Sequence, residues 1–192
     1  MGSEPLTLGF DTAAAHCAAA LLSGERVLAC RAEEMGRGQA ERLMPLLEEV
    51  LAEGGVHWGD LGRIGVGIGP GNFTGIRISV AAARGLALAL DISAFGISVF
   101  DVIRARGNDG TPAVSAPRGM LHVLGSGEVP ALIPAAKVSA PAWPPPPADL
   151  AQAIATLAQS APQSAPPPAP IYIRPADAAP ARDAPPVILD DG

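Results

Sequence analysis

Proline is distributed very unevenly along this chain of 192 residues. Only Pro5, Pro45 and Pro70 of its 21 prolines precede residue 112. Because proline donates no backbone hydrogen bond and clashes inside helices and central strands, long regular elements are expected mainly before that point. We therefore predict a packed first lobe over residues 1–106, followed by a shortened, proline-rich second lobe and carboxyl-terminal tail over residues 107–192.

Hydrophobic periodicity predicts a regular order of elements in the first lobe. Three short apolar runs joined by tight turns indicate consecutive strands, and leucines at helical spacing then indicate a helix that ends at Gly54 and Gly55. Strands and helices alternate after that. This β-β-β-α-β-α-β-α order predicts an α/β fold with a mixed sheet flanked by helices. The expected strands cover residues 6–10, 17–22, 27–32, 64–68 and 92–97, and the expected helices cover residues 39–53, 76–90 and 99–106.

The second lobe carries weaker signals. Residues 113–115, 120–124 and 129–133 fit short strands, and residues 150–157 fit one short helix. The proline-rich stretch that follows is of low complexity, and residues 171–173 fit a short extended segment. We therefore expect less regular structure here than in the first lobe.

Composition and charge exclude several classes of protein. The formal net charge of −6 argues against a chain that grips nucleic acid by its phosphates. The best apolar run, Ile78–Leu90, contains Arg84 and is shorter than the roughly 20 residues that span a membrane. Acidic Glu4 and Asp11 stand where a secretory leader carries basic residues. We expect a cytoplasmic protein with no membrane contact.

The residues offer neither a metal site nor a catalytic nucleophile. The three histidines, His16, His57 and His122, share no helical spacing, and we expect each of them at the surface or at an edge. Cys17 and Cys30 lie in apolar runs, where cysteine usually acts as a small buried hydrophobe. The chain contains no G-x-S-x-G nucleophile motif. We therefore assign no catalytic or metal-ligating residue.

The segment Gly65–Arg77 (GVGIGPGNFTGIR) is the sharpest local motif. A strand enters a Gly-Pro-Gly turn and then a helix, whose first amides could hold an anion. Alternatively, the glycines form a rigid turn that presses the helix against the strand, since the dinucleotide-binding and P-loop patterns both fail here. We predict a structural role for Gly71, where a tight turn needs a positive φ, and for Gly75, which opens the helix close to the sheet. The candidate phosphate-loop residues are Asp11, Thr12, Gly69, Gly71, Thr74, Gly75 and Arg77.

The two helices expected over residues 39–53 and 76–90 also suggest a partner surface. The leucines of the first helix pack on the sheet, but the small residues of the second helix would let another helix approach closely. We predict that Ala83 and Ala87, spaced i and i+4, share a face that points outward. The candidate partner-interface residues are Gln39, Glu41, Arg42, Met44, Ala83 and Ala87.

Several of these motifs together resemble the TsaB family of bacterial tRNA threonylcarbamoyladenosine biosynthesis proteins, which are glycoprotease-like. The resemblance rests on LGFDT at Leu8–Thr12, QAERLMP at Gln39–Pro45 and GIGPGNFTGIR at Gly67–Arg77. It covers residues 5–104, and a second match over residues 170–189 is similar to the family's carboxyl-terminal segment. The resemblance implies an actin/Hsp70-like (ASKHA) fold of two related lobes.

This chain departs from the family at two places. Asn72 stands where the family usually has serine. Ala116–Gly119 stands where the family tends to have a similar stretch with an acidic residue, which is lost here. Because residues 107–169 are also shorter and richer in proline than the family implies, we expect a reduced second lobe.

The resemblance also implies a function. Family members act as a non-catalytic partner of the paralogue TsaD, which with TsaE and ATP installs threonylcarbamoyl on adenosine 37 of tRNAs that read codons starting with A. The two helices would then pair with TsaD, or with a second copy in a homodimer, as a helix bundle. This chain alone would bind no cofactor, because ATP and magnesium are expected at partner subunits. It would meet tRNA only through the complex.

An alternative class also stays open. The chain could be an independently active ATPase or phosphotransferase of the same fold, which Asp11, Thr12 and the glycine-rich segment favour slightly. A metallopeptidase fits less well, because the chain lacks the metal-binding histidine pair of TsaD.

Overall fold

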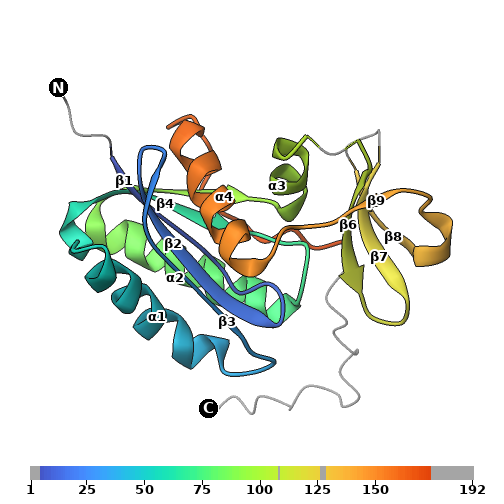
Figure 1. The fold of residues 1–192 in the computed structure, drawn as a ribbon, viewed down its shortest axis with the longest axis horizontal. Helices are drawn as coiled ribbons and strands as arrows, with labels where there is room; N and C mark the ends of the chain where they lie inside the picture. The colour runs from blue at the N-terminus through green and yellow to red at the C-terminus, as the bar shows by residue number, and fades with distance from the viewer. Residues whose placement is uncertain (1–4, 108, 126–128, 174–192) are drawn as a thin grey trace, which may run out of the picture.

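Two β-sheets and four α-helices form the fold over residues 5–107, 109–125 and 129–173, which the computed structural model describes (Figure 1). The helices are α1 (Gln39–Glu53), α2 (Phe73–Leu90), α3 (Val99–Ala105) and α4 (Pro147–Ser160). The first sheet contains β1 (Leu6–Asp11), β2 (His16–Ser23), β3 (Arg26–Glu34), β4 (Leu61–Gly67) and β5 (Ser93–Ile97). The second sheet contains β6 (Thr111–Ala116), β7 (Met120–Leu124), β8 (Pro130–Pro134) and β9 (Pro141–Ala142).

The first sheet has the strand order β3-β2-β1-β4-β5. Strands β1, β2 and β3 form an antiparallel meander, and β4 and β5 run parallel to β1. The predicted mixed sheet and the predicted order of elements through α3 are therefore confirmed. Helix α2 begins at Phe73 rather than at residue 76, because the Asn72 side chain accepts a 3.0 Å hydrogen bond from the Gly75 amide and caps the helix there.

Helices cover both faces of this sheet (Figure 1). On one face, Leu8, Phe10 and Ile64 of the strands pack in a core with the leucines of α1, and α2 lies beside α1. Helix α4 lies on the opposite face, against β1, β2 and β4. Although α4 follows residue 106 in the chain, it therefore belongs to the packing of the first sheet. Its buried residues are Leu150, Ala151, Ile154, Ala155 and Ala158.

Small residues let α4 approach the sheet closely. A Cβ atom added to Gly9 would lie 2.6 Å from the carbonyl oxygen of Ala151. A Cβ atom added to Gly65 would lie 2.8 Å from the carbonyl oxygen of Ile154. Since real Cβ atoms do not come so near to a backbone oxygen, both strand positions require glycine as long as α4 stays where it is.

The second sheet has the order β8-β7-β6-β9 and is more regular than the sequence suggests. The three short strands expected there are found with shifts of a few residues at their ends, and the expected short helix lies within α4. The two-residue strand β9 was not expected, because it is too short to show a period and contains Pro141. Residues 171–173 form no strand, although the Ile171 amide donates a 2.9 Å hydrogen bond to the Ile68 carbonyl. The carboxyl-terminal sequence match beyond residue 173 lies outside the described residues.

Helix α2 is unusually apolar for a helix at a protein surface. Its 18 residues have a mean hydropathy of 1.4, and it is the one helix among the described residues that is long and apolar enough to cross a membrane. One side of it is buried against the sheet through Ile76, Val80 and Ala83, and the other side exposes Arg77 and Arg84. In this fold α2 is therefore a sheet-packing helix.

Candidate functional site

The turn after β1 is joined to the start of α2. The Thr12 hydroxyl donates a 2.7 Å hydrogen bond to the Gly75 carbonyl, and the Asn72 amide donates a 2.6 Å bond to the Ala13 carbonyl. Thr12 is fully buried, and the adjacent Asp11 is 1% exposed. The fold thus brings the predicted Asp11-Thr12 pair against the glycine-rich loop, but it uses the threonine hydroxyl to hold the loop in place.

Two glycines of the loop lie directly on this turn. A Cβ atom on Gly71 would overlap the Ala13 carbonyl oxygen, and one on Gly75 would overlap the Thr12 carbonyl oxygen. Both positions therefore have the close contacts expected of structural glycines. The reason predicted for Gly71 is wrong, however, because the positive φ of 96° belongs to Gly69 and not to Gly71. Close approach of the backbone, rather than turn conformation, is what requires glycine at position 71.

Asp11 forms a buried pair with His16. Its Oδ2 atom lies 2.7 Å from His16 Nε2 and accepts a 3.0 Å hydrogen bond from the Ala13 amide. His16 is 6% exposed and belongs to the inner strand β2, so the expectation that it lies at the surface or at an edge is wrong. It is buried because it opens β2, directly beside the end of β1. The pair therefore ties β1 to β2 across the turn between them.

The other carboxylate oxygen of Asp11 is enclosed. Asp11 Oδ1 has no hydrogen-bond partner among the described residues, and Gly67 lies so close that a Cβ atom there would overlap it. No group of three histidine, cysteine or acidic residues that could hold a metal ion occurs in the described part of the chain. A bare anion placed beside this carboxylate would be repelled. The geometry therefore favours a structural role for Asp11.

The remaining phosphate-loop candidates do not converge with Asp11. Thr74 and Arg77 are exposed on the first turns of α2, and the Arg77 guanidinium lies 5.2 Å from the centre of the Phe73 ring. Gly69 faces the Ile76 side chain, whose Cδ1 atom would lie 2.7 Å from an added Cβ. Of the seven candidates, five therefore lie at or near the turn after β1. The other two, Thr74 and Arg77, have exposed side chains.

The predicted outward face of α2 is wrong at Ala83. This residue is fully buried in the core of the sheet, and Ala87 is half-buried. The sequence alone does not show which face of α2 points outward, because alanine, glycine and leucine occur on all sides of this helix.

Exposed residues on the outer sides of α1 and α2 offer a different candidate surface, and Arg84 and Leu88 on it also border a hollow beside β5. Leu88 is 87% exposed, and it continues a row that begins at Arg77 with spacings of four, three and four residues. Met44 is exposed on the neighbouring α1. The sequence analysis missed Leu88, although this helical spacing from Arg77 was a signal that could have found it. We call this the α1–α2 surface and define it by Glu41, Met44, Glu48, Arg77, Ala81, Arg84 and Leu88.

Two of the predicted interface residues hold α1 in place instead. Arg42 forms ion pairs with Glu33 of β3 at 2.6 Å and with Glu49 of α1 at 2.7 Å. Hydrogen bonds from this guanidinium hold the pKa values of both carboxyl groups below their ordinary range. The Gln39 side chain donates a 3.1 Å hydrogen bond to the Met35 carbonyl. Arg42 and Gln39 therefore tie α1 to β3 and to the loop before the helix.

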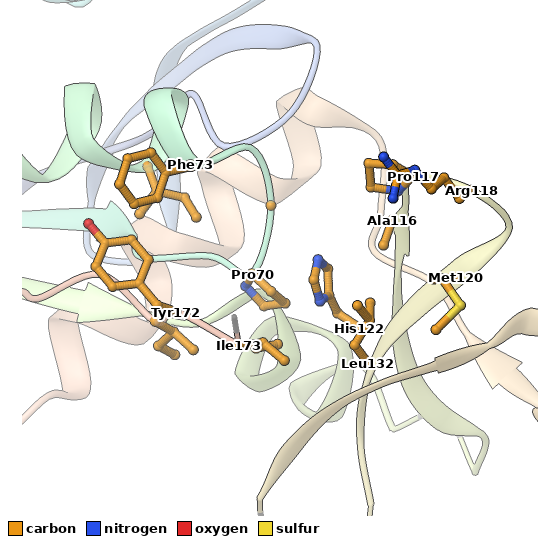
Figure 2. Close-up of a pocket in the computed structure, with 13 residues that line it drawn as sticks. Pro70, Phe73, Ala116, Pro117, Arg118, Met120, His122, Leu132, Tyr172 and Ile173 are labelled. Atoms are coloured by element: carbon orange, nitrogen blue, oxygen red, sulfur yellow. The ribbon is translucent and has the colours of Figure 1, made fainter. Parts of the chain in front are cut away.

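A cavity lies between the glycine-rich loop and the hairpin of β6 and β7 (Figure 2). Its lining includes Phe73, Arg118, His122 and Tyr172. Sequence reasoning missed these residues as a group because they come from three segments that are far apart in the chain.

Several known proteins are similar to this chain in sequence. A sequence model of the family described as TsaD, tRNA N6-adenosine threonylcarbamoyltransferase, matches residues 32–130, more than half of the chain. A TsaB protein from Buchnera aphidicola is 33% identical over 98 residues, which are 51% of this chain and 46% of that protein. The TsaB protein of Escherichia coli is 35% identical over 91 residues, which are 47% of this chain and 39% of that protein. The chain belongs to the TsaB family. It spans about half or less of the length of these two TsaB relatives.

The TsaB assignment extends to the fold. A crystal structure from Pseudomonas aeruginosa, described as an uncharacterised protein with similarity to peptidase YeaZ, has a TM-score of 0.59 and 29% identity. The match covers 70% of this chain and 69% of that one. Together with the mixed sheet, this likeness identifies the actin/Hsp70-like fold that the sequence resemblance implies. The residues matched by the TsaD model include the whole α1–α2 surface and the glycine-rich loop.

Proposed function

We propose that this chain is a non-catalytic subunit that supports TsaD in threonylcarbamoyladenosine synthesis on tRNA. The proposal draws on the names of its TsaB relatives, which are tRNA threonylcarbamoyladenosine biosynthesis proteins. The observation that carries it is Leu88, a large apolar side chain that is 87% exposed at the end of the α2 row of the α1–α2 surface. Exposed apolar side chains that gather on one face commonly mark protein–protein contacts.

The charges of the α1–α2 surface suit a helical partner. Its α1 row carries acidic Glu41 and Glu48, and its α2 row carries basic Arg77 and Arg84. A partner helix laid along this surface would meet acidic side chains on one row and basic side chains on the other, and each row also carries an exposed apolar residue, Met44 or Leu88. Because each row complements the other, a second copy of the chain could occupy the same surface when TsaD is absent.

Nucleotide and tRNA would be handled elsewhere in the complex. One oxygen of the buried Asp11 carboxylate contacts His16 and the Ala13 amide, and the other is enclosed beside Gly67, which leaves Asp11 poorly placed to hold magnesium and phosphate. The net charge of −6 disfavours binding of tRNA by this chain alone. In this proposal ATP and magnesium bind at the partner subunits, and TsaE joins the complex. The chain meets tRNA only as part of that complex.

Co-purification with TsaD of the same organism tests the partner surface. Replacing Leu88→Glu should weaken the interaction at least tenfold, because a charged side chain would be buried without a partner at the contact. Ser115→Glu, at an exposed position of the second sheet, is the matched control and should bind like the wild type. Circular dichroism should show both variants folded. Wild-type affinity in folded Leu88→Glu would refute the proposed surface.

A cellular experiment tests the function itself. Depletion of the protein should lower threonylcarbamoyladenosine in bulk tRNA, measured by mass spectrometry of nucleosides. Wild-type protein should restore the modification, whereas the Leu88→Glu variant should not. Magnesium-dependent ATP turnover by the isolated chain would instead favour an independent enzyme and contradict the non-catalytic role.

A further inference from the structure

The cavity beside the glycine-rich loop has the size of a small-molecule site. Its volume is about 530 Å³, within the range of roughly 300–1,000 Å³ that is typical of ligand pockets. Pro70 lines one side, and Met120 and Leu132 line the other (Figure 2). Ile76 is also part of the lining. No residue of the α1–α2 surface lines it, so the proposed partner role leaves this cavity unexplained.

Two aromatic rings form one end of the cavity. The ring centres of Phe73 and Tyr172 are 5.0 Å apart, with an angle of 35° between the ring planes. Phe73 is 41% exposed and Tyr172 is 48% exposed, so both rings keep free area. The backbone hydrogen bond from the Ile171 amide to the Ile68 carbonyl holds Tyr172 at this position. Together the two tilted rings offer an apolar aromatic surface against which a planar group can pack.

Arg118 lies at the other end, in an unusual backbone conformation. Its φ is 62°, in the left-handed region that side chains rarely adopt, and it stands at the tip of the hairpin before Gly119. Glycine or asparagine would form such a tip more easily. A strained backbone at a basic residue that lines a cavity points to a role for the side chain rather than for the turn.

The charges of the lining favour an anion. The cavity lining includes the Arg118 guanidinium, and no acidic residue is among the described residues that line the cavity. The Arg77 guanidinium, 5.2 Å from the Phe73 ring centre, adds a positive charge near the aromatic end. This differs from the chain as a whole, whose net charge is −6.

We propose that this cavity binds a small organic anion with a planar apolar body. The planar body packs against Phe73 and Tyr172, and the anionic group faces Arg118, on the opposite side of the cavity in Figure 2. A guanidinium can bind such a group through charge-assisted hydrogen bonds, which are stronger than neutral ones. No residue of the α1–α2 surface lines the cavity, although Arg77 of that surface lies beside Phe73, so binding can be tested without TsaD.

Fluorescence titration of the full chain with two probes tests this proposal. Anilinonaphthalene sulfonate has a planar naphthalene ring system, an apolar anilino ring and one negative charge. Phenylnaphthylamine has a similar body without the charge. Arg118→Gly should weaken binding of the sulfonate about tenfold and leave binding of the neutral probe within about twofold. Glycine suits the left-handed backbone, so this variant keeps the hairpin tip while removing the guanidinium.

Further variants locate the probe. Phe73→Ala should weaken both probes, because the stacking wall serves the apolar body that they share. Arg118→Lys should retain part of the sulfonate binding, since the charge remains but the planar fork is lost. Arg26→Ala removes an exposed arginine at the start of β3 and is the matched control, with no expected effect on either probe.

Three outcomes would overturn the proposal. Unchanged sulfonate binding in Arg118→Gly would show that the guanidinium does not contact the anion. Equal weakening of both probes in that variant would show that the hairpin, rather than the charge, determines binding. Unchanged binding of both probes in Phe73→Ala would place them outside the cavity.

Discussion

The hydroxyl of Thr12 donates a 2.7 Å hydrogen bond to the carbonyl oxygen of Gly75, a residue 63 positions later in the chain. Both groups are buried. The bond uses a carbonyl in the first turn of α2 and fastens that turn to the end of β1. Because a Cβ atom on Gly75 would overlap the Thr12 carbonyl, the contact depends on glycine at one partner and on a hydroxyl at the other.

The first prediction concerns this contact. Gly75→Ala should lower the free energy of unfolding by about 1–3 kcal/mol, because the added methyl group meets backbone that cannot move away easily. Gly85→Ala is a matched control in the same helix, since a Cβ atom there meets nothing within 4 Å. It should raise stability by roughly 0.5–1 kcal/mol through helix propensity. Urea denaturation measures both, and equal effects of the two changes would contradict the packing described here.

The second prediction separates the two faces of α2. Ala83→Glu should destabilise the protein by several kcal/mol, on the order of 3–5, because it places an unpaired charge in the core. Ala81→Glu, on the exposed face two residues away, should change stability by less than about 0.5 kcal/mol. Thermal and urea denaturation of both variants check this. A stable Ala83→Glu protein would mean that the helix is rotated relative to the structure.

A third prediction concerns the Cys17 thiol. Burial raises its pKa from the ordinary value of 9.0 to about 11, with a smaller contribution from the negative charge of Glu33. At pH 8 only roughly one thiol in a thousand is then ionised, and the thiolate is the reactive form. Iodoacetamide should therefore label Cys17 far more slowly in the native protein than in urea, as followed by peptide mass spectrometry. Similar rates in both conditions would show that the strand opens readily.

The fourth prediction concerns the ion pairs of Arg42. Its guanidinium holds the pKa values of Glu33 and Glu49 below their ordinary value of 4.5. The stabilisation is therefore present above about pH 4.5 and is lost as the pH falls through the lowered pKa values. Arg42→Gln should lower the thermal midpoint at neutral pH, and the difference from the wild type should shrink in acid.

Salt provides the control for this prediction. Because Glu33 and Glu49 are 38% and 40% exposed, added sodium chloride should also reduce the difference between Arg42→Gln and the wild type. A difference that stays constant with both pH and salt would assign the effect to packing of the arginine stem.

Helix α1 shows how far local sequence can predict structure. Leu43, Leu46, Leu47, Val50 and Leu51 repeat at helical spacing, and all five are buried as predicted. The pattern works there because charged residues occupy the other side. Helix α2 offers no such contrast, since apolar residues occur all around it, and the prediction for Ala83 therefore failed.

The candidate site was less predictable than the elements. Asp11 and His16 were both noted in the sequence, but their pairing depends on β1 and β2 lying side by side across a short turn. Phe73 and Tyr172 meet only because residues 171–173 return to the edge of the glycine-rich loop. No periodicity records a contact between segments so far apart in the chain.

The sequence by itself determined the order of strands and helices in the first lobe and the family motifs. These depend on residues a few positions apart, whose spacing sets which side chains share a face. Only the tertiary structure decided that α4 lies on Gly9 and Gly65, that Ala83 points inward and that Arg118 lines a cavity with Tyr172. Those outcomes depend on how distant surfaces fit together, because close packing selects among faces that the local pattern leaves equivalent.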